Sequence, residues 1–150
     1  MFERILMVCV GNICRSPLAA ALWNRSAGEA GLVARAESAG LAAPEGAATH
    51  PIVLRLLAES GTPSPESSAR PLSVELLNAA DLILVMESWH AREIERRLPY
   101  LLGRVFTLGH WDGAEIQDPY NEPEAVFRSV YTQIERGVDA WIEKLNAERP

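Results

Sequence analysis

The stretch VCVGNICRSP, residues 8–17, follows a short apolar run and precedes residues with the spacing of a helix. Five residues separate Cys9 from Arg15, and Gly11 and Asn12 lie between them. This order predicts a strand, a turn that directs successive backbone N–H groups inward, and the start of a helix. A helix N-terminus has unpaired N–H groups and the positive end of the helix dipole, so it stabilises both an oxyanion and a cysteine thiolate. The stretch therefore predicts a phosphate-binding loop in which Cys9 is the nucleophile.

Three residues at the end of this stretch fit the same interpretation. The planar guanidinium of Arg15 can donate two parallel hydrogen bonds to phosphoryl oxygens and stays charged at any working pH. The Ser16 hydroxyl can donate to the sulfur, and Pro17 lies where a helix needs no N–H donor. The alternative is an inert, buried Cys9 whose spacing from an arginine is accidental. The strand and the Gly, Asn, Ser and Pro around Cys9 together favour the phosphate loop.

Length and composition indicate one domain. The chain has 150 residues, of which 48% are hydrophobic, which suffices for one well-buried core but not for two ordinary domains. We therefore expect a single domain over residues 1–150. The net charge of −6, without an arginine-rich tail, argues against nucleic acid as a partner. Affinity for phosphate is expected to be local to the loop.

The sequence has no features of a membrane or secreted protein. No stretch reaches the ~18 apolar residues of a membrane span, and the short apolar N-terminus lacks a small-residue cleavage site. The two cysteines, Cys9 and Cys14, lie in one loop and do not form a secreted disulfide framework. We expect a cytoplasmic protein without a membrane span. Because the three histidines are scattered, we expect no metal and no other cofactor.

Apolar segments with the lengths of strands alternate with segments of helical period, which predicts an α/β fold with a parallel sheet of four or five strands. Residues 80–86 have the continuous apolar character of a strand buried on both faces. Residues 60–68, rich in Ser and Pro, predict a surface loop. Parallel sheets bind ligands at the carboxyl ends of their strands, where Cys9 is expected. We expect strands at 4–9, 34–38, 80–86 and 103–108, and helices at 17–31, 51–60, 90–98 and 122–145.

The chemistry also requires an acid. A thiolate that attacks an aryl phosphate must expel a phenolate, and protonating the leaving oxygen typically contributes 10²- to 10⁴-fold. Asp118 is the best candidate, because Pro119 follows it and would hold its carboxyl group in one orientation. The alternative is that this dipeptide only begins a turn before the last helix. From the dipeptide alone, the turn is the favoured interpretation.

Three stretches together resemble the low-molecular-weight protein tyrosine phosphatases: residues 8–17, residues 37–40 (Glu-Ser-Ala-Gly) and residues 118–120 (Asp-Pro-Tyr). The similarity spans nearly the whole chain. It implies a single-domain, three-layer, flavodoxin-like α/β fold, in which helices flank a four-stranded parallel sheet. It also implies an enzyme with a phosphocysteine intermediate, with Cys9 as the nucleophile, Arg15 as the phosphate clamp and Asp118 as the acid and then the base.

The resemblance implies supporting residues as well. Asn12 takes a strained loop conformation, which asparagine tolerates better than most residues. Ser38 forms a hydrogen bond with Asn12. Without the resemblance, Ser38 fits equally well as a serine at a strand end that bonds local backbone. Pro119 supports the acid. The residues expected to contact the phosphate or the substrate ring are Val10, Gly11, Asn12, Ile13, Cys14, Ser16, Leu41 and Tyr120.

Within the family, residues 109–112 (Gly-His-Trp-Asp) and the pair Gly40-Leu41 resemble the bacterial branch that is paired with tyrosine autokinases of exopolysaccharide export. Leu41 and Tyr120 would then line the mouth of the site and clamp the substrate ring. A deep slot favours the long aryl arm of phosphotyrosine over phosphoserine. The expected partner is a phosphotyrosine protein such as a tyrosine autokinase, and the enzyme is expected to be mostly monomeric.

Cys14 has two interpretations. It is either a small filler of the loop or a thiol that captures oxidised Cys9 as a disulfide and so prevents irreversible oxidation. A second loop cysteine in some family members favours protection. For the other side chains that attract notice we expect no chemical role: surface or turn positions for His50, His90 and His110, and packing for Trp111 and Trp141.

Two other functions fit a phosphate loop on this scaffold. An arsenate reductase would bind arsenate as a phosphate analogue, but no cysteine follows Cys14 to relay electrons, so it would need an external thiol. A non-enzymatic phosphate-binding module would leave Cys9 and Asp118 idle. A trapped phosphothiol intermediate would dismiss the binding module, and an assay of thiol-dependent arsenate reduction would test the reductase.

Overall fold

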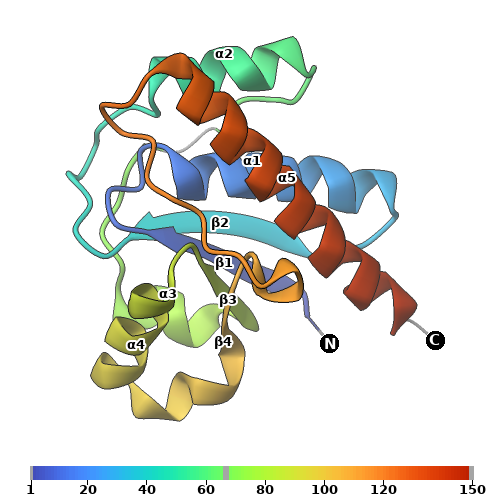
Figure 1. Cartoon of the computed structure of the whole chain (residues 1–150). Coiled ribbons are helices and arrows are strands. Elements are labelled where there is room, and N and C mark those ends of the chain that lie inside the picture. Colours follow the sequence, from blue (N-terminus) through green and yellow to red (C-terminus); the bar gives the residue numbers. More distant parts are fainter. Residues whose placement is uncertain (1, 66–67, 149–150) are drawn as a thin grey trace.

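Four parallel strands form the sheet, in the order β2-β1-β3-β4 (Figure 1). The computed structural model describes residues 2–65 and 68–148. The two inner strands consist almost entirely of buried side chains, as expected of a parallel sheet that is covered on both faces. The strands are β1 (Arg4–Cys9), β2 (Arg35–Gly40), β3 (Leu82–Val85) and β4 (Val105–Thr107).

Helices cover both faces of the sheet and give three layers (Figure 1). One face is covered by α1 (Arg15–Glu29), α2 (Pro51–Glu59) and α5 (Glu124–Ala147). The other is covered by α3 (Val74–Ala79) and α4 (Ser88–Arg97), and the short 3-10 helices η1 (Pro99–Arg104) and η2 (His110–Asp112) flank β4. The expected three-layer α/β fold with a four-stranded parallel sheet is confirmed.

The alternation of side chains along β1 decides where Cys9 points. Met7 and Cys9 belong to the hydrophobic cluster that contains side chains of α1, α2 and α5. Leu6 and Val8 belong to the other cluster, beneath α3 and α4. Cys9 therefore ends the strand on the face where α1 begins.

Several boundaries differ from those expected. The helix α3 was not predicted, because six residues are too few to show a helical period. Its local signal is Ser73, whose hydroxyl oxygen accepts the backbone N–H of Leu76 at 3.1 Å. The strand β2 continues to Gly40, two residues beyond the expected end at 38, and α4 begins at Ser88 instead of 90. Of the expected surface loop at 60–68, residues 66 and 67 lie outside the described residues.

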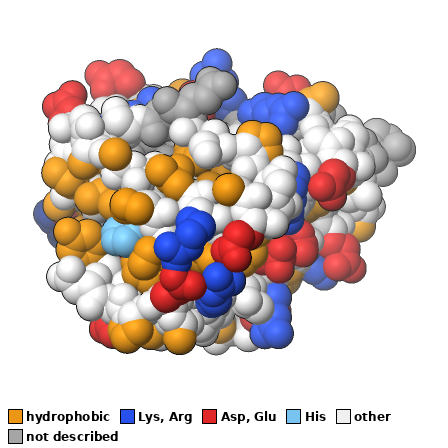
Figure 2. All heavy atoms as spheres, turned by 90° about the horizontal axis from the view of Figure 1, so that it is seen from above, with side chains coloured by type: hydrophobic (Ala, Val, Ile, Leu, Met, Phe, Trp, Pro, Cys, Tyr) orange, Lys and Arg blue, Asp and Glu red, His pale blue; other side chains and the backbone are white. Residues whose placement is uncertain are grey.

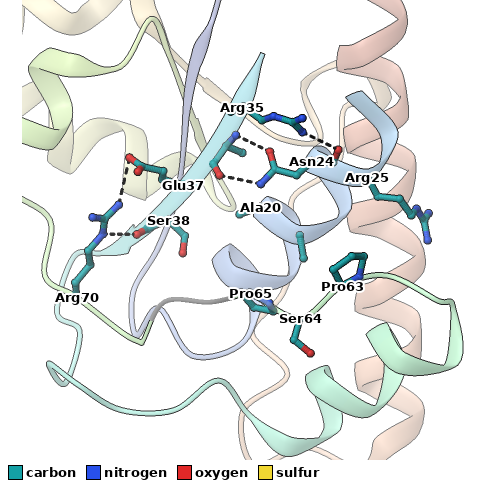
Figure 3. Close-up of a pocket in the computed structure, with 12 residues that line it drawn as sticks. Ala20, Asn24, Arg25, Arg35, Glu37, Ser38, Pro63, Ser64, Pro65 and Arg70 are labelled. Carbon is teal, nitrogen blue, oxygen red and sulfur yellow. Dashed lines mark hydrogen bonds and ion pairs between the residues drawn. The ribbon is translucent and has the colours of Figure 1, made fainter. Parts of the chain in front are cut away.

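The strand β2 lies at an edge of the sheet, and side chains bind part of its free backbone (Figure 3). The side chain of Asn24 accepts the N–H of Ala36 at 2.8 Å and donates to the Ala36 carbonyl at 3.1 Å. Arg70 donates through Nε to the Ser38 carbonyl at 2.9 Å, beside a hollow of about 500 Å³. Unpaired edges are otherwise available for pairing with another chain. These bonds also hold Ser38 in position beside the Cys9 loop.

The surface shows no concentration of one charge on the face drawn in Figure 2. Hydrophobic side chains gather on its left, the side on which the strands end in Figure 1, whereas acidic and basic side chains are mixed elsewhere. Within the described residues, no helix combines the length and the apolar character needed to cross a membrane. Trp141 is buried, as expected, and donates to the Leu108 carbonyl at 3.1 Å, while Trp111 packs against it and is 44% exposed.

Candidate active site

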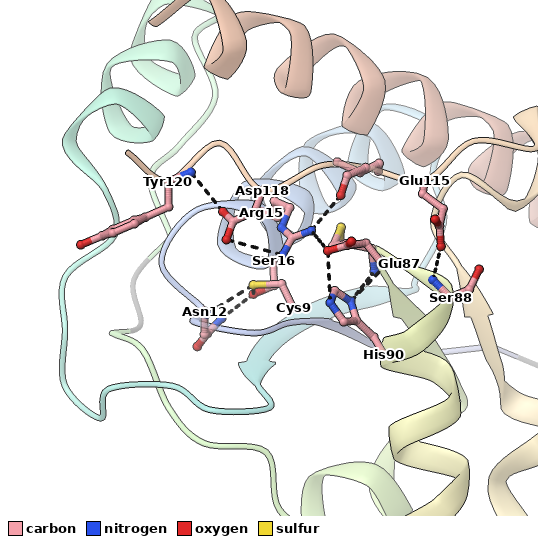
Figure 4. A network of polar contacts seen from close by, with 12 residues as sticks. Cys9, Asn12, Arg15, Ser16, Glu87, Ser88, His90, Glu115, Asp118 and Tyr120 are labelled. Carbon is pink, nitrogen blue, oxygen red and sulfur yellow. Dashed lines mark hydrogen bonds and ion pairs between the residues drawn. The ribbon is translucent and has the colours of Figure 1, made fainter. Parts of the chain in front are cut away.

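The loop between β1 and α1 closes around the Cys9 sulfur (Figure 4). The Sγ atom accepts the backbone N–H of Asn12 at 3.3 Å and lies 2.9 Å from the Ser16 hydroxyl oxygen. Asn12 has a φ of 55°, the left-handed conformation expected of it. A Cβ at Gly11 would meet nothing closer than Ile13 at 3.9 Å. The turn therefore depends on Asn12 and not on Gly11.

The side chain of Asn12 fixes the inside of the loop. Its Oδ1 accepts the backbone N–H of Arg70 at 3.0 Å, and its Nδ2 donates to Ser16 at 2.7 Å and to Ser38 at 2.9 Å. Because an N–H donor faces Oδ1, the orientation of the amide is set by its partners. The Ser16 oxygen accepts from Asn12, so the Ser16 hydrogen is free to point at the Cys9 sulfur. The implied bond between Asn12 and Ser38 is present, and Arg70 is a partner that sequence reasoning missed.

The end of β2 pins the other side of the loop. Leu41 donates its N–H to the Cys9 carbonyl at 2.9 Å. A Cβ on Gly40 would lie 2.5 Å from the Val10 carbonyl oxygen, so no other residue fits there without a shift of the backbone. Leu41 packs against the hydrophobic cluster beneath α3 and α4. Its expected place at the mouth stays a prediction, because it does not line the cavity above Cys9.

Arg15 is buried, with only 2% of its side chain exposed. Its Nη1 donates to the Glu87 carboxylate and to the Ile116 carbonyl, both at 2.7 Å. Its Nη2 lies 3.9 Å from the Asp118 carboxylate. One edge of the guanidinium is thus anchored to the protein, while the other faces the acid. Glu87 was missed because nothing in its local sequence relates it to Arg15.

Asp118 lies on an exposed segment across from Arg15, with 54% of its side chain accessible. Its Oδ1 accepts the backbone N–H of Tyr120 at 3.0 Å across Pro119. This is the turn that the dipeptide alone favours, and the same turn orients the carboxyl group towards the site. The two interpretations of Asp118 are therefore compatible.

Most of the predicted residues line one cavity of about 190 Å³. Tyr120 is 51% exposed, and its ring meets that of His50 edge-on at 6.1 Å. The other predicted residues do not line this cavity: Asn12 bonds Ser16 and Ser38 through its side chain, and Leu41 packs against the hydrophobic cluster beneath α3 and α4. Within residues 2–65 and 68–148, no group of three or more His, Cys, Asp or Glu side chains could hold a metal ion. The cavity is lined by Cys9, Val10, Gly11, Ile13, Cys14, Arg15, Asp118 and Tyr120.

This arrangement can bind a phosphoryl group and attack it. The sulfur, the loop N–H groups and the guanidinium converge on one cavity, and a carboxyl group lies opposite. The chain matches, over residues 4–150, the family described as low molecular weight phosphotyrosine protein phosphatase. The chain belongs to this family. It is therefore a protein-tyrosine-phosphatase of the low-molecular-weight, cysteine-dependent class.

Relatives and solved structures agree with this assignment. The low molecular weight protein-tyrosine-phosphatase Wzb of Escherichia coli K12 is 41% identical over 150 residues, which is 99% of each chain. A solved structure described as a protein tyrosine phosphatase is 42% identical and covers 100% of both chains, with a TM-score of 0.91. The YwlE arginine phosphatase of Geobacillus stearothermophilus is 33% identical, with a TM-score of 0.89 over 97% of this chain and 94% of that one. The scaffold therefore includes relatives named for different phosphorylated residues.

The two loop cysteines of the phosphatase are both free and buried. Burial, with the negative charges of Asp118 and Cys9 as smaller contributions, raises the pKa of Cys14 to about 12. Cys14 is therefore a protonated thiol at neutral pH. Its role as filler or as a capturing thiol stays a prediction.

The expectation for the histidines was wrong at one position. His110 is exposed and His50 is half-buried, but His90 is fully buried, with 0% exposure. The sequence around His90 is mostly polar, because α4 exposes most of its other residues. For this reason nothing in the sequence indicated that His90 faces inward. His90 lies against Glu87, the partner of Arg15 (Figure 4).

Proposed function

We propose that the phosphatase hydrolyses phosphotyrosine in two steps through a phosphocysteine. In the first step, the Cys9 thiolate bonds to phosphorus while the bond from phosphorus to the tyrosyl oxygen breaks, and Asp118 gives its proton to that oxygen. In the second step, a water oxygen bonds to phosphorus while the bond to sulfur breaks, and Asp118 takes the proton of the water. Arg15 and the loop N–H groups stabilise the nonbridging oxygens in both steps.

One observation carries this proposal: the Cys9 sulfur, the Arg15 guanidinium and the Asp118 carboxylate line the same cavity. The nucleophile is at its base, where it is 2% exposed, and the acid is at its open side. A phosphoryl group between them would have the sulfur and the leaving oxygen on opposite sides, as an in-line displacement requires. Catalysis here comes from groups that are in place before the substrate arrives.

The hydrogen bonds around Ser16 support the role of the thiolate. Because the Ser16 oxygen accepts from Asn12, its hydrogen can be donated to the Cys9 sulfur at 2.9 Å. The N–H of Asn12 adds a second donor to the same atom. Hydrogen-bond donors that face the sulfur stabilise the negative charge it carries as the nucleophile of the first step and as the leaving group of the second. Ser16 therefore assists both steps.

The depth of the site supports an aryl phosphate as the substrate. The sulfur is buried, whereas Tyr120 stands half-exposed at the mouth beside His50. A phosphotyrosine side chain is long enough to reach the sulfur while its ring packs against the Tyr120 ring. Phosphoserine, with a shorter and non-aromatic arm, would have neither contact.

We further propose that the physiological substrate is a tyrosine autokinase of exopolysaccharide or capsule production and that hydrolysis takes place in the cytoplasm. The support is the resemblance of residues 109–112 and of Gly40-Leu41 to the bacterial branch, together with the 41% identity to Wzb. The free thiols of Cys9 and Cys14 fit a reducing compartment. Dephosphorylation of the tyrosine-rich tail of such a kinase should be faster than that of a scrambled phosphotyrosine peptide.

The test of the chemistry is the Cys9→Ser variant. It should lose turnover while it still binds inorganic phosphate or vanadate, because the loop N–H groups and Arg15 remain. Rapid acid quench of the wild-type enzyme should trap phosphate on Cys9, identified by mass spectrometry of the peptide. Full activity in a clean Cys9→Ser preparation would refute the nucleophile. A panel of phosphotyrosine, phosphoserine and phosphoarginine peptides, with arsenate and an external thiol, then separates the proposed substrate from its alternatives.

A further inference from the structure

His90 lies in the first turn of α4 and is 0% exposed, although most of the other side chains of that helix are exposed or only partly buried. Its imidazole packs edge-on against the Trp89 ring at 4.4 Å. It takes no part in the two steps proposed above. A fully buried histidine needs partners for its ring nitrogens, and these partners show what it does.

The contacts of Nδ1 fix the tautomer. Nδ1 accepts the backbone N–H of Met86 at 3.3 Å and that of Glu87 at 3.1 Å. An atom that accepts cannot carry the hydrogen, so the neutral ring carries it on Nε2. Burial, together with the charge of Arg15, lowers the pKa of His90 to about 4, against the opposing effects of Glu87, Glu115 and Asp118. His90 is therefore a neutral donor at physiological pH.

Nε2 lies beside the Glu87 carboxylate. Nε2 lies 3.4 Å from Oε2 of Glu87, the same oxygen that accepts from Arg15 at 2.7 Å (Figure 4). This contact is not a hydrogen bond, and among the described residues Nε2 has no hydrogen-bond partner. The chain of contacts runs from His90 through one carboxylate oxygen to the guanidinium. Because the imidazole is neutral, it can restrain the carboxylate without competing with Arg15 for its charge.

We propose that His90 is a positioning residue, which restrains the Glu87 carboxylate and thereby sets the direction in which the Arg15 guanidinium faces the phosphoryl group. This inference rests on the proposed function in one respect, since it needs Arg15 to bind phosphate. Glu87 has a second oxygen and rotatable bonds, and without His90 its carboxylate has more freedom to turn. Loss of the His90 contact would lower both phosphate affinity and kcat, because a more mobile Arg15 guanidinium aligns the phosphoryl group less often.

The rival role of His90 is structural, because Nδ1 also satisfies two backbone N–H groups at the start of α4. Two substitutions separate the roles. In His90→Asn the amide lies where Nδ1 was, so an acceptor for the backbone remains and the donor to Glu87 is lost. In His90→Gln the amide reaches where Nε2 was, so a donor to Glu87 remains and the acceptor is lost.

The experiment measures inorganic phosphate binding by calorimetry, kcat/KM on an aryl phosphate, and Tm for each variant. His90→Asn should keep its Tm within about 3 °C of wild type and bind phosphate about tenfold more weakly, with a similar loss in kcat/KM. His90→Gln should have a lower Tm but phosphate affinity within about threefold of wild type. In a Glu87→Gln background, His90→Asn should have no further effect on phosphate affinity, since its route to Arg15 is already broken.

Three results would overturn the positioning role. They are unchanged phosphate affinity in His90→Asn, losses that follow Tm in both variants, or an effect of His90→Asn that persists fully in the Glu87→Gln background. The proposed function fails separately: if wild type binds phosphate but does not hydrolyse phosphotyrosine, the calorimetric comparison still decides the role of His90. Nitrogen-15 shifts of the wild-type ring should show Nδ1 without and Nε2 with a hydrogen.

Discussion

The nucleophile loop, residues 9–15, and the acid segment, residues 118–121, face each other across one cavity, but they are built differently. In the loop, Cys9 and Arg15 are each 2% exposed. The side chain of Asn12 bonds three other segments, through Ser16 of α1, Ser38 of β2 and the backbone of Arg70. In the acid segment, Asp118 and Tyr120 are more than half exposed, and the carboxylate is oriented by a local bond across Pro119. The groups that hold the phosphate are thus fixed by tertiary contacts, and the group that moves the proton is held by a turn.

The largest loss of activity is expected for Arg15→Lys, in the nucleophile loop. The ammonium cannot bond Glu87, Ile116 and two phosphoryl oxygens at once, because it has no planar fork. We expect kcat/KM on aryl phosphates to fall about 10³-fold, with weaker phosphate binding. Steady-state kinetics and calorimetry check this, and Arg128→Lys, on an exposed ion pair of α5, is the control that should leave both unchanged. A loss below about threefold at Arg15 would contradict the clamp.

The second change acts on the acid segment. Asp118→Asn should slow substrates with poor leaving groups by about 10²-fold and activated aryl phosphates far less, because only the former need the proton. Phosphate binding should stay close to wild type, in contrast to Arg15→Lys. A series of aryl phosphates with different leaving-group pKa values measures the slope, and equal losses across the series would count against the acid role.

The third test compares the two asparagines with left-handed backbones, one in each region. Asn12→Gly keeps the φ of 55° accessible but removes three hydrogen bonds, so the free energy of unfolding should fall by about 2 kcal/mol and kcat/KM by about tenfold. Asn121→Gly, at a φ of 67° on the exposed acid segment, should change both only slightly. Urea denaturation and kinetics check the pair. Equal effects at the two positions would show that the loop network contributes little.

The last expected change is in stability, when the pH is lowered. The pKa of His90 falls from 6.5 in the unfolded chain to about 4 in the fold, so the unfolded state binds more protons between these values. The stability that His90 contributes is present above pH 6.5 and is lost as pH falls towards 4, by up to roughly 3 kcal/mol. Urea unfolding between pH 7 and pH 4 measures this slope, and His90→Asn should flatten it. An unchanged slope in that variant would assign the pH dependence to other groups.

The local part of the molecule could be predicted well. The apolar run, the turn and the helix start around Cys9 are properties of consecutive residues, so the loop and the parallel α/β sheet could be expected before any contact was known. The short helix α3 could not be predicted, because six residues are too few to show a helical period. The burial of His90 could not be predicted either, because the sequence around it is mostly polar. Residues that act through distant partners leave no signal in a neighbouring stretch.

Consecutive residues are enough to place a cysteine and an arginine in one loop at the N-terminus of a helix, and an Asp-Pro turn late in the chain. The directions in which these side chains face depend on contacts between distant segments. Arg70, Glu87 and the Ile116 carbonyl come from three other segments to hold Asn12 and Arg15, and His90 lies against Glu87. The physical reason is that backbone preference and hydrophobic period act between near neighbours, whereas the aim of a buried side chain is set by whatever packs against it.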